Sequence, residues 1–202
     1  MGEFASLYAR NDKGHIKFSS DNDLRDSLFP NSMKHPAKYN LFMLVSIIEY
    51  VSIQGDTLLD IMSGTGSIML GALMGRKVIS IEIEKYYYDL QVASLKHLQK
   101  NNADNIKDMV TLLHGDCMDF LPFPSNTVDH IIFSPPYASV MKRKSNPTTD
   151  GDRQISGGDT WDFEKYHQTK GNVGNLEVFM YNMYMENIYR MCYQTLPPGG
   201  TM

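Results

Sequence analysis

The stretch Thr57-Leu58-Leu59-Asp60-Ile61-Met62-Ser63-Gly64-Thr65-Gly66-Ser67 decides the predicted fold. Its first five residues have the apolar character of a short buried strand, and the two glycines then allow a tight turn. Helical character resumes at Ile68 and continues to Leu73. Strand, glycine turn and helix in this order predict the first unit of an α/β domain.

Three more strands are predicted downstream of this unit, at 77–82, 109–113 and 128–133. A helix over 84–100 separates the first two of them. Strands that alternate with helices are joined by right-handed crossovers and form a parallel sheet. We therefore expect a doubly wound α/β fold.

The composition fits one ordinary domain with extra segments. The chain has 202 residues and a net charge of −4, from 19 Lys+Arg and 23 Asp+Glu. This balance argues against binding to nucleic acid by bulk charge, although Lys142, Arg143 and Lys144 form a compact basic run. No apolar run approaches the roughly 18 residues of a membrane span, and no secretory signal is recognisable, so we expect a cytoplasmic protein. Two cysteines, Cys117 and Cys192, provide neither a disulfide framework nor the spacing of a metal site.

The chain divides into two predicted regions. Residues 1–34 are polar and lack a sustained period, so we expect an irregular arm, and residues 35–202 form the catalytic domain. A polar stretch at about 138–174 is expected to be a mobile loop, after which Asn175 would cap a final helix. Met202 lies where a fifth strand should begin, so we expect that a further C-terminal region or a second chain completes the sheet.

The acid and glycine pattern of the first unit predicts a cofactor site. Asp60 ends the first strand, Gly64 and Gly66 form the turn, and Glu82 follows 22 residues after Asp60, where an acid commonly binds ribose hydroxyls. Met69 stands where a dinucleotide fingerprint has its third glycine. An acid at the start of the turn would repel a pyrophosphate and suits a cofactor with a cationic end, which favours S-adenosyl-L-methionine. A plain tight turn is the alternative.

A second pattern, Ser134-Pro135-Pro136-Tyr137, directly follows the fourth predicted strand. Consecutive prolines fix φ and remove backbone donors, which leaves their carbonyl oxygens free to accept a hydrogen bond from an amine. The serine hydroxyl and the tyrosine ring add an acceptor and an aromatic face, which suit a planar base with an exocyclic amine. A rigid loop entrance is the alternative interpretation.

These motifs resemble those of the amino-group DNA methyltransferases, which modify N4 of cytosine or N6 of adenine. The resemblance runs from 35 to 200 and includes His35-Pro36-Ala37-Lys38-Tyr39, the glycine turn, Glu82, Gly115-Asp116, the Ser-Pro-Pro-Tyr motif and Leu196-Pro197-Pro198-Gly199-Gly200. It implies a Rossmann-like methyltransferase sheet and a γ-like motif order, in which a recognition region follows the catalytic domain. No such region is present in these 202 residues, and Met62 stands where the family commonly has an aromatic residue.

The resemblance also implies roles for individual residues. The glycine turn would hold the methionine part of the cofactor, Glu82 the ribose and Asp116 the adenine amine, and the His35 segment would close over the methionine end. The full predicted cofactor set is His35, Pro36, Ala37, Asp60, Met62, Ser63, Gly64, Gly66, Ser67, Glu82, Asp116 and Cys117. Cys117 is also expected to lie in the core, as is Cys192.

The predicted catalytic set is Ser134, Pro135, Pro136 and Tyr137, and no metal is expected. Ser134 and the Pro135 carbonyl would accept hydrogen bonds from the target amine, Tyr137 would stack on the base, and the base would leave the duplex to reach the pocket. The basic run at 142–144 would contact phosphates of the DNA. Carbon-5 chemistry on cytosine needs a cysteine nucleophile, and neither cysteine has that setting.

The choice of substrate stays open at this point. A serine at the head of the motif favours N4 of cytosine, whereas the resembling adenine enzymes more often have aspartate there. An RNA or protein amine methyltransferase is a rival enzyme. A catalytically idle subunit that binds cofactor and pairs with a second chain is a rival from another class.

Overall fold

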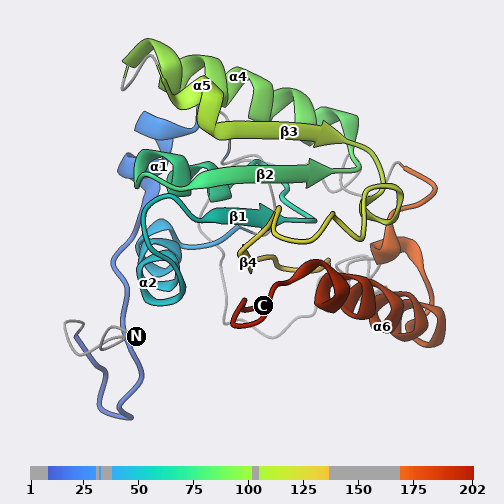
Figure 1. Ribbon diagram of the computed structural model, residues 1–202. Coiled ribbons are helices and arrows are strands. Elements are labelled where there is room, and N and C mark those ends of the chain that lie inside the picture. The colour runs from blue at the N-terminus through green and yellow to red at the C-terminus, as the bar shows by residue number, and fades with distance from the viewer. Residues whose placement is uncertain (1–8, 31, 33–37, 102–104, 137–168) are drawn as a thin grey trace, which may run out of the picture.

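The structure is a computed structural model that describes residues 9–30, 32, 38–101, 105–136 and 169–202. Figure 1 presents an open sheet with helices on its two faces. The helices and strands are α1 (Asn22–Leu28), α2 (Leu41–Val51), β1 (Thr57–Asp60), α3 (Leu70–Leu73), β2 (Lys77–Glu82), α4 (Lys85–Asn101), α5 (Ile106–Met109), β3 (Val110–His114), β4 (His130–Ile131) and α6 (Val178–Thr195). Short 3-10 helices lie at η2 (Ser67–Met69), η3 (Cys117–Asp119) and η6 (Val173–Asn175).

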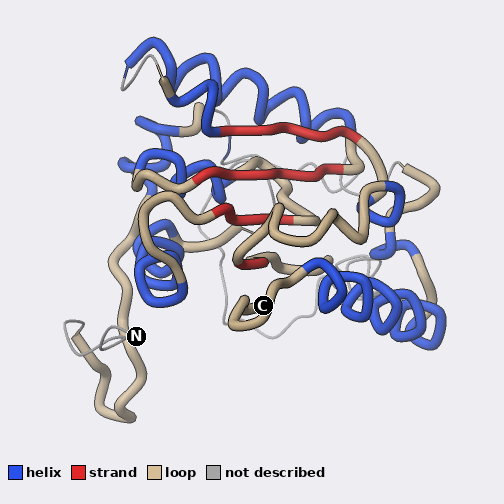
Figure 2. The backbone as a smooth tube through the Cα atoms, in the orientation of Figure 1, coloured by secondary structure: helices blue, strands red, loops and turns tan. Residues whose placement is uncertain are grey.

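The four strands form one parallel sheet in the order β3-β2-β1-β4. Figure 2 displays the strands as neighbouring segments in the centre of the molecule. The chain leaves β1 towards β2 and β3 on one side and returns to β4 on the other, which is the topology of a doubly wound fold. The predicted fold class is therefore confirmed, although β4 is shorter than the predicted strand 128–133.

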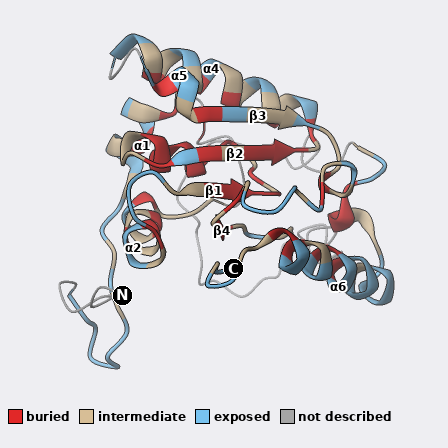
Figure 3. Cartoon of the chain, in the orientation of Figure 1, coloured by how far each residue is buried: buried red, intermediate tan, exposed pale blue. Residues whose placement is uncertain are grey.

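Alternate strand residues pack into two separate apolar cores, one on each face of the sheet. Leu58 of β1 and Val78 of β2 lie in the core covered by α1 to α5. Leu59 of β1 and Ile81 of β2 lie in the core covered by α6. Figure 3 marks the buried strands between these layers. Burial on both faces explains why the strand sequences are apolar at successive positions.

Two helical segments differ from the sequence predictions. The arm predicted to be irregular contains α1, whose apolar residues pack against the first core. Asn175 does not cap α6 because it lies in η6, and Glu177 is the N-cap residue without a side-chain cap bond. Asn40, in contrast, caps α2 by accepting a hydrogen bond from the Met43 backbone N–H at 3.1 Å.

The outward face of α6 (Val178–Thr195) carries exposed apolar side chains. Met185, Ile188 and Cys192 are buried, whereas Phe179 and Met183 are 73% and 53% exposed. The first turns of this helix therefore carry apolar side chains that the described residues do not cover. Within the part of the chain that the structure describes, no helix is long and apolar enough to cross a membrane.

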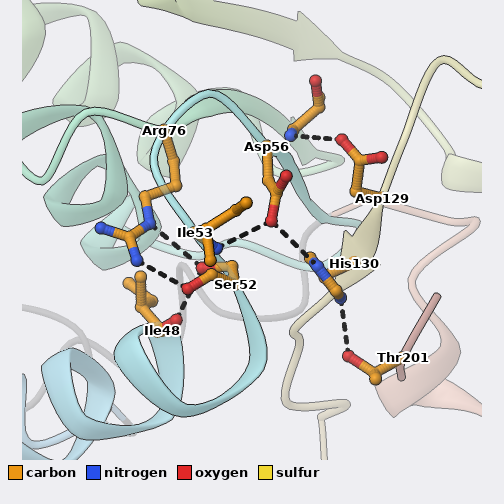
Figure 4. A network of polar contacts seen from close by, with 9 residues as sticks. Ile48, Ser52, Ile53, Asp56, Arg76, Asp129, His130 and Thr201 are labelled. Atoms are coloured by element: carbon orange, nitrogen blue, oxygen red, sulfur yellow. Dashed lines mark hydrogen bonds and ion pairs between the residues drawn. The ribbon is translucent and has the colours of Figure 1, made fainter. Parts of the chain in front are cut away.

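A polar network joins the amino ends of β1 and β4, at the end of the sheet that lies opposite the glycine turn (Figure 4). His130 contacts Asp56 at 3.3 Å and Thr201 at 2.9 Å, and Asp129 accepts a hydrogen bond from the Thr57 backbone N–H at 2.8 Å. Thr201 also forms a parallel bridge with His130. Residues after α6 thus return to pair beside β4, where the sequence predicts a fifth strand.

Candidate cofactor and substrate site

The glycine turn after β1 lies at the carboxyl end of the sheet and is fixed by its own backbone. Ser63 donates two hydrogen bonds to the Ile81 carbonyl of β2, from its N–H at 3.1 Å and its hydroxyl at 2.9 Å. The Gly66 N–H donates to the Ser63 carbonyl at 2.8 Å. Gly66 has a φ of +79°, a conformation that costs little only for glycine. The turn is therefore rigid and close to β2.

Gln91 of α4 holds the turn through hydrogen bonds. This side chain is fully buried, and its amide nitrogen donates to the Ser63 hydroxyl at 2.8 Å and to the Gly64 carbonyl at 2.6 Å. Its amide oxygen accepts from the Ser80 hydroxyl at 2.7 Å. Both the amide nitrogen and the amide oxygen of Gln91 therefore bind the turn or β2, and Gln91 couples α4 to the predicted cofactor loop.

Glu82, at the end of β2, also contacts the turn. Its carboxylate accepts hydrogen bonds from the Gly64 N–H at 2.6 Å and from the Glu84 N–H at 2.8 Å. Burial raises the pKa of Glu82 to about 8, against the lowering effect of these two bonds. The charges of Glu84 and Asp60 raise this pKa further.

Asp60, at the end of β1, is the second buried acid at the carboxyl end of the sheet. Its carboxylate accepts from the Met62 N–H at 3.1 Å, and burial raises its pKa to about 7. Burial, together with the charge of Asp60, raises the pKa of Tyr39, whose buried hydroxyl has no hydrogen-bond partner among the described residues. Among the described residues, neither Asp60 nor Glu82 forms an ion pair with lysine or arginine. Such buried acids favour a ligand that carries positive charge.

Arg25 joins the N-terminal arm to the turn. The side chain is fully buried, donates to the Ser67 hydroxyl at 3.0 Å and forms an ion pair with Asp21 at 2.8 Å. It also donates to the Tyr39 carbonyl, and Asp21 accepts from the Leu41 N–H at 2.9 Å. The arm is thus part of the scaffold of this site.

Asp116 and Cys117 follow β3 at the same carboxyl end of the sheet. Asp116 accepts from the Met118 N–H at 3.0 Å and caps η3. Cys117 and Cys192 are buried in the core beside α6, as expected, and burial raises the pKa of each thiol to about 12. Neither thiol is therefore suited to act as a nucleophile near neutral pH.

Ser134, Pro135 and Pro136 follow β4, the strand that pairs with β1, after the two intervening residues Ile132 and Phe133. The register aligns Leu59 with Ile131, and the Ile132 N–H donates to the Leu59 carbonyl at 2.9 Å just beyond β4. Ser134 is exposed and the two prolines are half-buried. This predicted catalytic segment therefore lies beyond the carboxyl end of β4, and the glycine turn lies beyond the carboxyl end of the neighbouring β1.

The structure brings together most of the predicted cofactor residues but does not describe all of the predicted site. The residues at the carboxyl end of the sheet are Asp60, Met62, Ser63, Gly64, Gly66, Ser67, Glu82, Asp116 and Cys117, and Ser134 to Pro136 follow the carboxyl end of β4. The predicted residues His35, Pro36, Ala37, Tyr137, Lys142, Arg143 and Lys144 lie outside the described residues. Within the described ranges, no group of three or more His, Cys, Asp or Glu side chains could hold a metal ion.

Three residues that position the site were not predicted from the sequence: Arg25, Glu84 and Gln91. Gln91 interrupts the apolar face of its helix, which was a usable signal for a buried polar role. The contacts of Arg25 and Glu84 join residues 42 and 85 positions apart, and no local pattern carries that information.

One protein-family model matches the N-terminal part of the chain. Residues 8–93 match the family model described as DNA methylase, with N6 and N4 specificity in its name. The match includes the glycine turn and Glu82 and stops before Asp116 and the Ser-Pro-Pro-Tyr motif. It confirms the resemblance to the amino-group DNA methyltransferases and supports S-adenosyl-L-methionine as the cofactor. No curated protein matches the chain significantly.

Solved structures resemble the fold. A precorrin 8w decarboxylase from Methanobacterium thermoautotrophicum is 18% identical with a TM-score of 0.51, and the alignment covers 87% of this chain and 67% of that chain. A SAM-dependent methyltransferase from Thiobacillus denitrificans in complex with S-adenosyl-L-homocysteine is 14% identical with a TM-score of 0.40, and covers 57% and 44% of the two chains. The chain spans only 37% and 56% of the first two proteins matched.

The fold is thus Rossmann-like, and residues 8–93 of the chain carry the sequence pattern of the amino-group DNA methyltransferases, a family that depends on S-adenosyl-L-methionine.

Proposed function

We propose that this chain transfers a methyl group from S-adenosyl-L-methionine to the exocyclic amine of a base in DNA, with N4 of cytosine as the favoured target. The observation that supports this proposal is the parallel pairing of β1, which leads into the glycine turn, with β4, which leads towards Ser134-Pro135-Pro136. A donor site and an acceptor site at adjacent strand ends suit direct group transfer.

The buried acids support the donor half of the proposal. Asp60 and Glu82 have raised pKa values and no cationic partner among the described residues. A ligand with a cationic sulfonium and ammonium would stabilise their ionised forms, whereas a pyrophosphate would not. The turn residues Ser63 to Ser67 would then hold the methionine part, Glu82 the ribose and Asp116 the adenine. Bound S-adenosyl-L-methionine would supply an electrophilic methyl group.

The acceptor half rests on Ser134 and the prolines. The Ser134 hydroxyl and the Pro135 carbonyl can accept hydrogen bonds from an amine, which would orient the nitrogen lone pair of that amine towards the donor. Tyr137 would stack on a flipped base, and the basic run at 142–144 would contact DNA phosphates. Much of the rate would come from this alignment rather than from acid or base catalysis.

The two cysteines favour amine methylation over carbon-5 methylation. The sequence holds only Cys117 and Cys192, and burial raises the pKa of both thiols to about 12. Carbon-5 chemistry needs an accessible thiolate nucleophile. The serine in the motif favours cytosine, and N6 of adenine is the alternative acceptor.

A competition assay tests the class of acceptor. The 202-residue chain would be incubated with isotope-labelled S-adenosyl-L-methionine and with duplex DNA, RNA and a basic protein together, and the label in each polymer counted. We expect label in DNA. Label confined to RNA or protein would identify a different acceptor, and cofactor binding without transfer to any of the three would support an idle subunit.

A further inference from the structure

The turn from Thr169 to Asn175 packs against the carboxyl ends of β2 and β3. Figure 1 displays this orange segment beyond the arrowheads of these strands, before α6 begins. The sequence predicts a mobile loop over about 138–174, of which 138–168 lie outside the described residues, but Asn172 and Val173 are both buried at 7% exposure. Val173 packs into the same core as Ile81 and Cys117. The described end of the predicted loop is therefore an ordered element.

Glu84 fixes this turn through several hydrogen bonds. Its carboxylate, in a residue only 3% exposed, accepts from the Thr169 N–H at 3.2 Å to each oxygen and from the Thr169 hydroxyl at 2.8 Å. It also accepts from the Asn172 side-chain amide at 2.7 Å. Hydrogen bonds to a charged group are among the stronger ones in proteins. Glu84 is thus the anchor of the turn.

The turn is also braced internally. The Asn172 side-chain oxygen accepts from the Gly174 N–H at 2.9 Å, and the Asn172 N–H donates to the Thr169 carbonyl at 3.0 Å. The Asn175 side chain donates to the same carbonyl at 3.3 Å. These bonds fix the conformation of the turn, and Glu84 holds its first residue, Thr169.

That geometry brings Gly171 against Asp116. A Cβ atom at position 171 would lie 3.3 Å from Asp116 Oδ2 and 3.3 Å from the Cδ1 atom of Ile83. The other carboxylate oxygen, Oδ1, accepts from the Met118 N–H. Asp116 Oδ2 therefore faces the turn, and glycine at 171 leaves its surroundings open where any larger residue would crowd it.

We infer that Glu84 is a positioning residue that selects adenine in the cofactor. Through the Thr169–Asn175 turn, Glu84 fixes the position of Gly171 opposite Asp116. Asp116 Oδ2 then accepts a hydrogen bond from the exocyclic amine of a purine. Gly171 faces this oxygen, and the Cδ1 atom of Ile83 lies near the same glycine. The inference rests on the proposed function, because it assumes that Asp116 lies beside the cofactor base.

Selectivity between two ligands tests this role more sharply than affinity alone. The probes are S-adenosyl-L-homocysteine and its inosine analogue, in which an oxygen replaces the exocyclic amine. Calorimetric titration of the 202-residue chain gives the ratio of the two dissociation constants. Because the analogue loses a hydrogen bond to a charged group, we expect the wild type to prefer the adenosine ligand by about tenfold or more.

The variants separate positioning from folding. Glu84→Ala removes the anchor and should bring the ratio close to one, whereas Glu84→Gln keeps an acceptor for Asn172 and should restore part of it. Gly171→Ala crowds Asp116 from an exposed position without removing a buried group, so it should lower the ratio in a folded protein. Glu186→Ala is the matched control, because Glu186 is an exposed acid paired only with Arg190 among its described ion pairs.

The outcomes are distinct. If the wild type binds both ligands with the expected ratio and folded Glu84→Ala and Gly171→Ala variants keep that ratio, the inference is overturned and the proposed function stands. If the wild type binds neither ligand, the proposed function fails and the inference fails with it.

Discussion

The Gln91 side-chain amide, in α4, donates a 2.6 Å hydrogen bond to the Gly64 carbonyl in the turn after β1. The Cγ atom of the same side chain lies 2.8 Å from the position that a Cβ on Gly66 would occupy. One buried side chain therefore both holds the turn and fills the space beneath its second glycine. The shape of the predicted cofactor loop depends on this contact.

Substitution of Gly66 by alanine should disrupt the turn. Gly66→Ala combines an unfavourable positive φ with a clash against Gln91 and Met69. Gly14→Ala is the matched control, because Gly14 has a φ of +78° but no atom within 4 Å of the position that a Cβ would take. We expect Gly66→Ala to destabilise the protein by about 1–3 kcal/mol more than the control, as overpacking usually does. Chemical denaturation measures both, and equal losses would contradict the role of Gln91.

The stability of the ligand-free protein should fall as the pH rises from about 4 to about 8. Burial raises the folded-state pKa of Asp60 to about 7 and of Glu82 to about 8, so the folded state retains protons that the unfolded chain has released. Stability is therefore greatest below the unfolded pKa values and declines until both acids ionise in the folded state. Asp60→Asn should flatten the part of this decline that ends near pH 7. Melting temperatures across the pH range measure it, and a rise with pH over this window would contradict the assignment.

Loss of Arg25 should destabilise the arm and the turn together. Arg25→Met leaves Asp21 without its buried partner, which commonly costs about 3–5 kcal/mol. Arg190→Met removes an exposed pair with Glu186 and should cost less than about 1 kcal/mol. Binding of S-adenosyl-L-homocysteine should weaken only in the Arg25 variant, because Arg25 donates to Ser67. Similar stability for the two variants would show that the arm does not support the site.

Replacement of Asp116 and of Ser134 should separate cofactor binding from methyl transfer. Asp116→Ala is expected to weaken cofactor binding by about tenfold, since it removes a charged hydrogen-bond acceptor. Ser134→Ala should leave binding unchanged and lower turnover, because Ser134 is exposed after β4 rather than packed within the glycine turn. Calorimetry and single-turnover methylation measure the two effects. An equal loss of binding in both variants would refute this division of roles.

The sequence predicts the parts of this molecule that depend on local pattern. Lys77–Glu82 has the same bounds in the sequence prediction and the structure, because its apolar residues and the flanking turns are all local signals. The acid-to-glycine spacing likewise identifies Asp60, Gly64, Gly66 and Glu82 as neighbours. Because the strands are parallel, Asp116 after β3 and Ser134 after β4 both follow the carboxyl ends of their strands.

Contacts between distant segments could not be predicted in this way. Glu84 reads as the start of a helix, yet its carboxylate binds Thr169 and Asn172. The polar composition around 138–174 predicts a loop throughout, whereas Val173 anchors its end in the core. The sequence shows that α6 contains apolar residues such as Phe179, but it does not show whether another element covers them.

Identification of the methylated nucleoside tests the central claim most directly. Duplex DNA would be treated with the chain and isotope-labelled S-adenosyl-L-methionine, digested to nucleosides, and analysed by chromatography with mass spectrometry. We expect label in N4-methylcytosine, and no label when Ser134 is replaced by alanine. Label in 5-methylcytosine, or DNA without any labelled base, would contradict it.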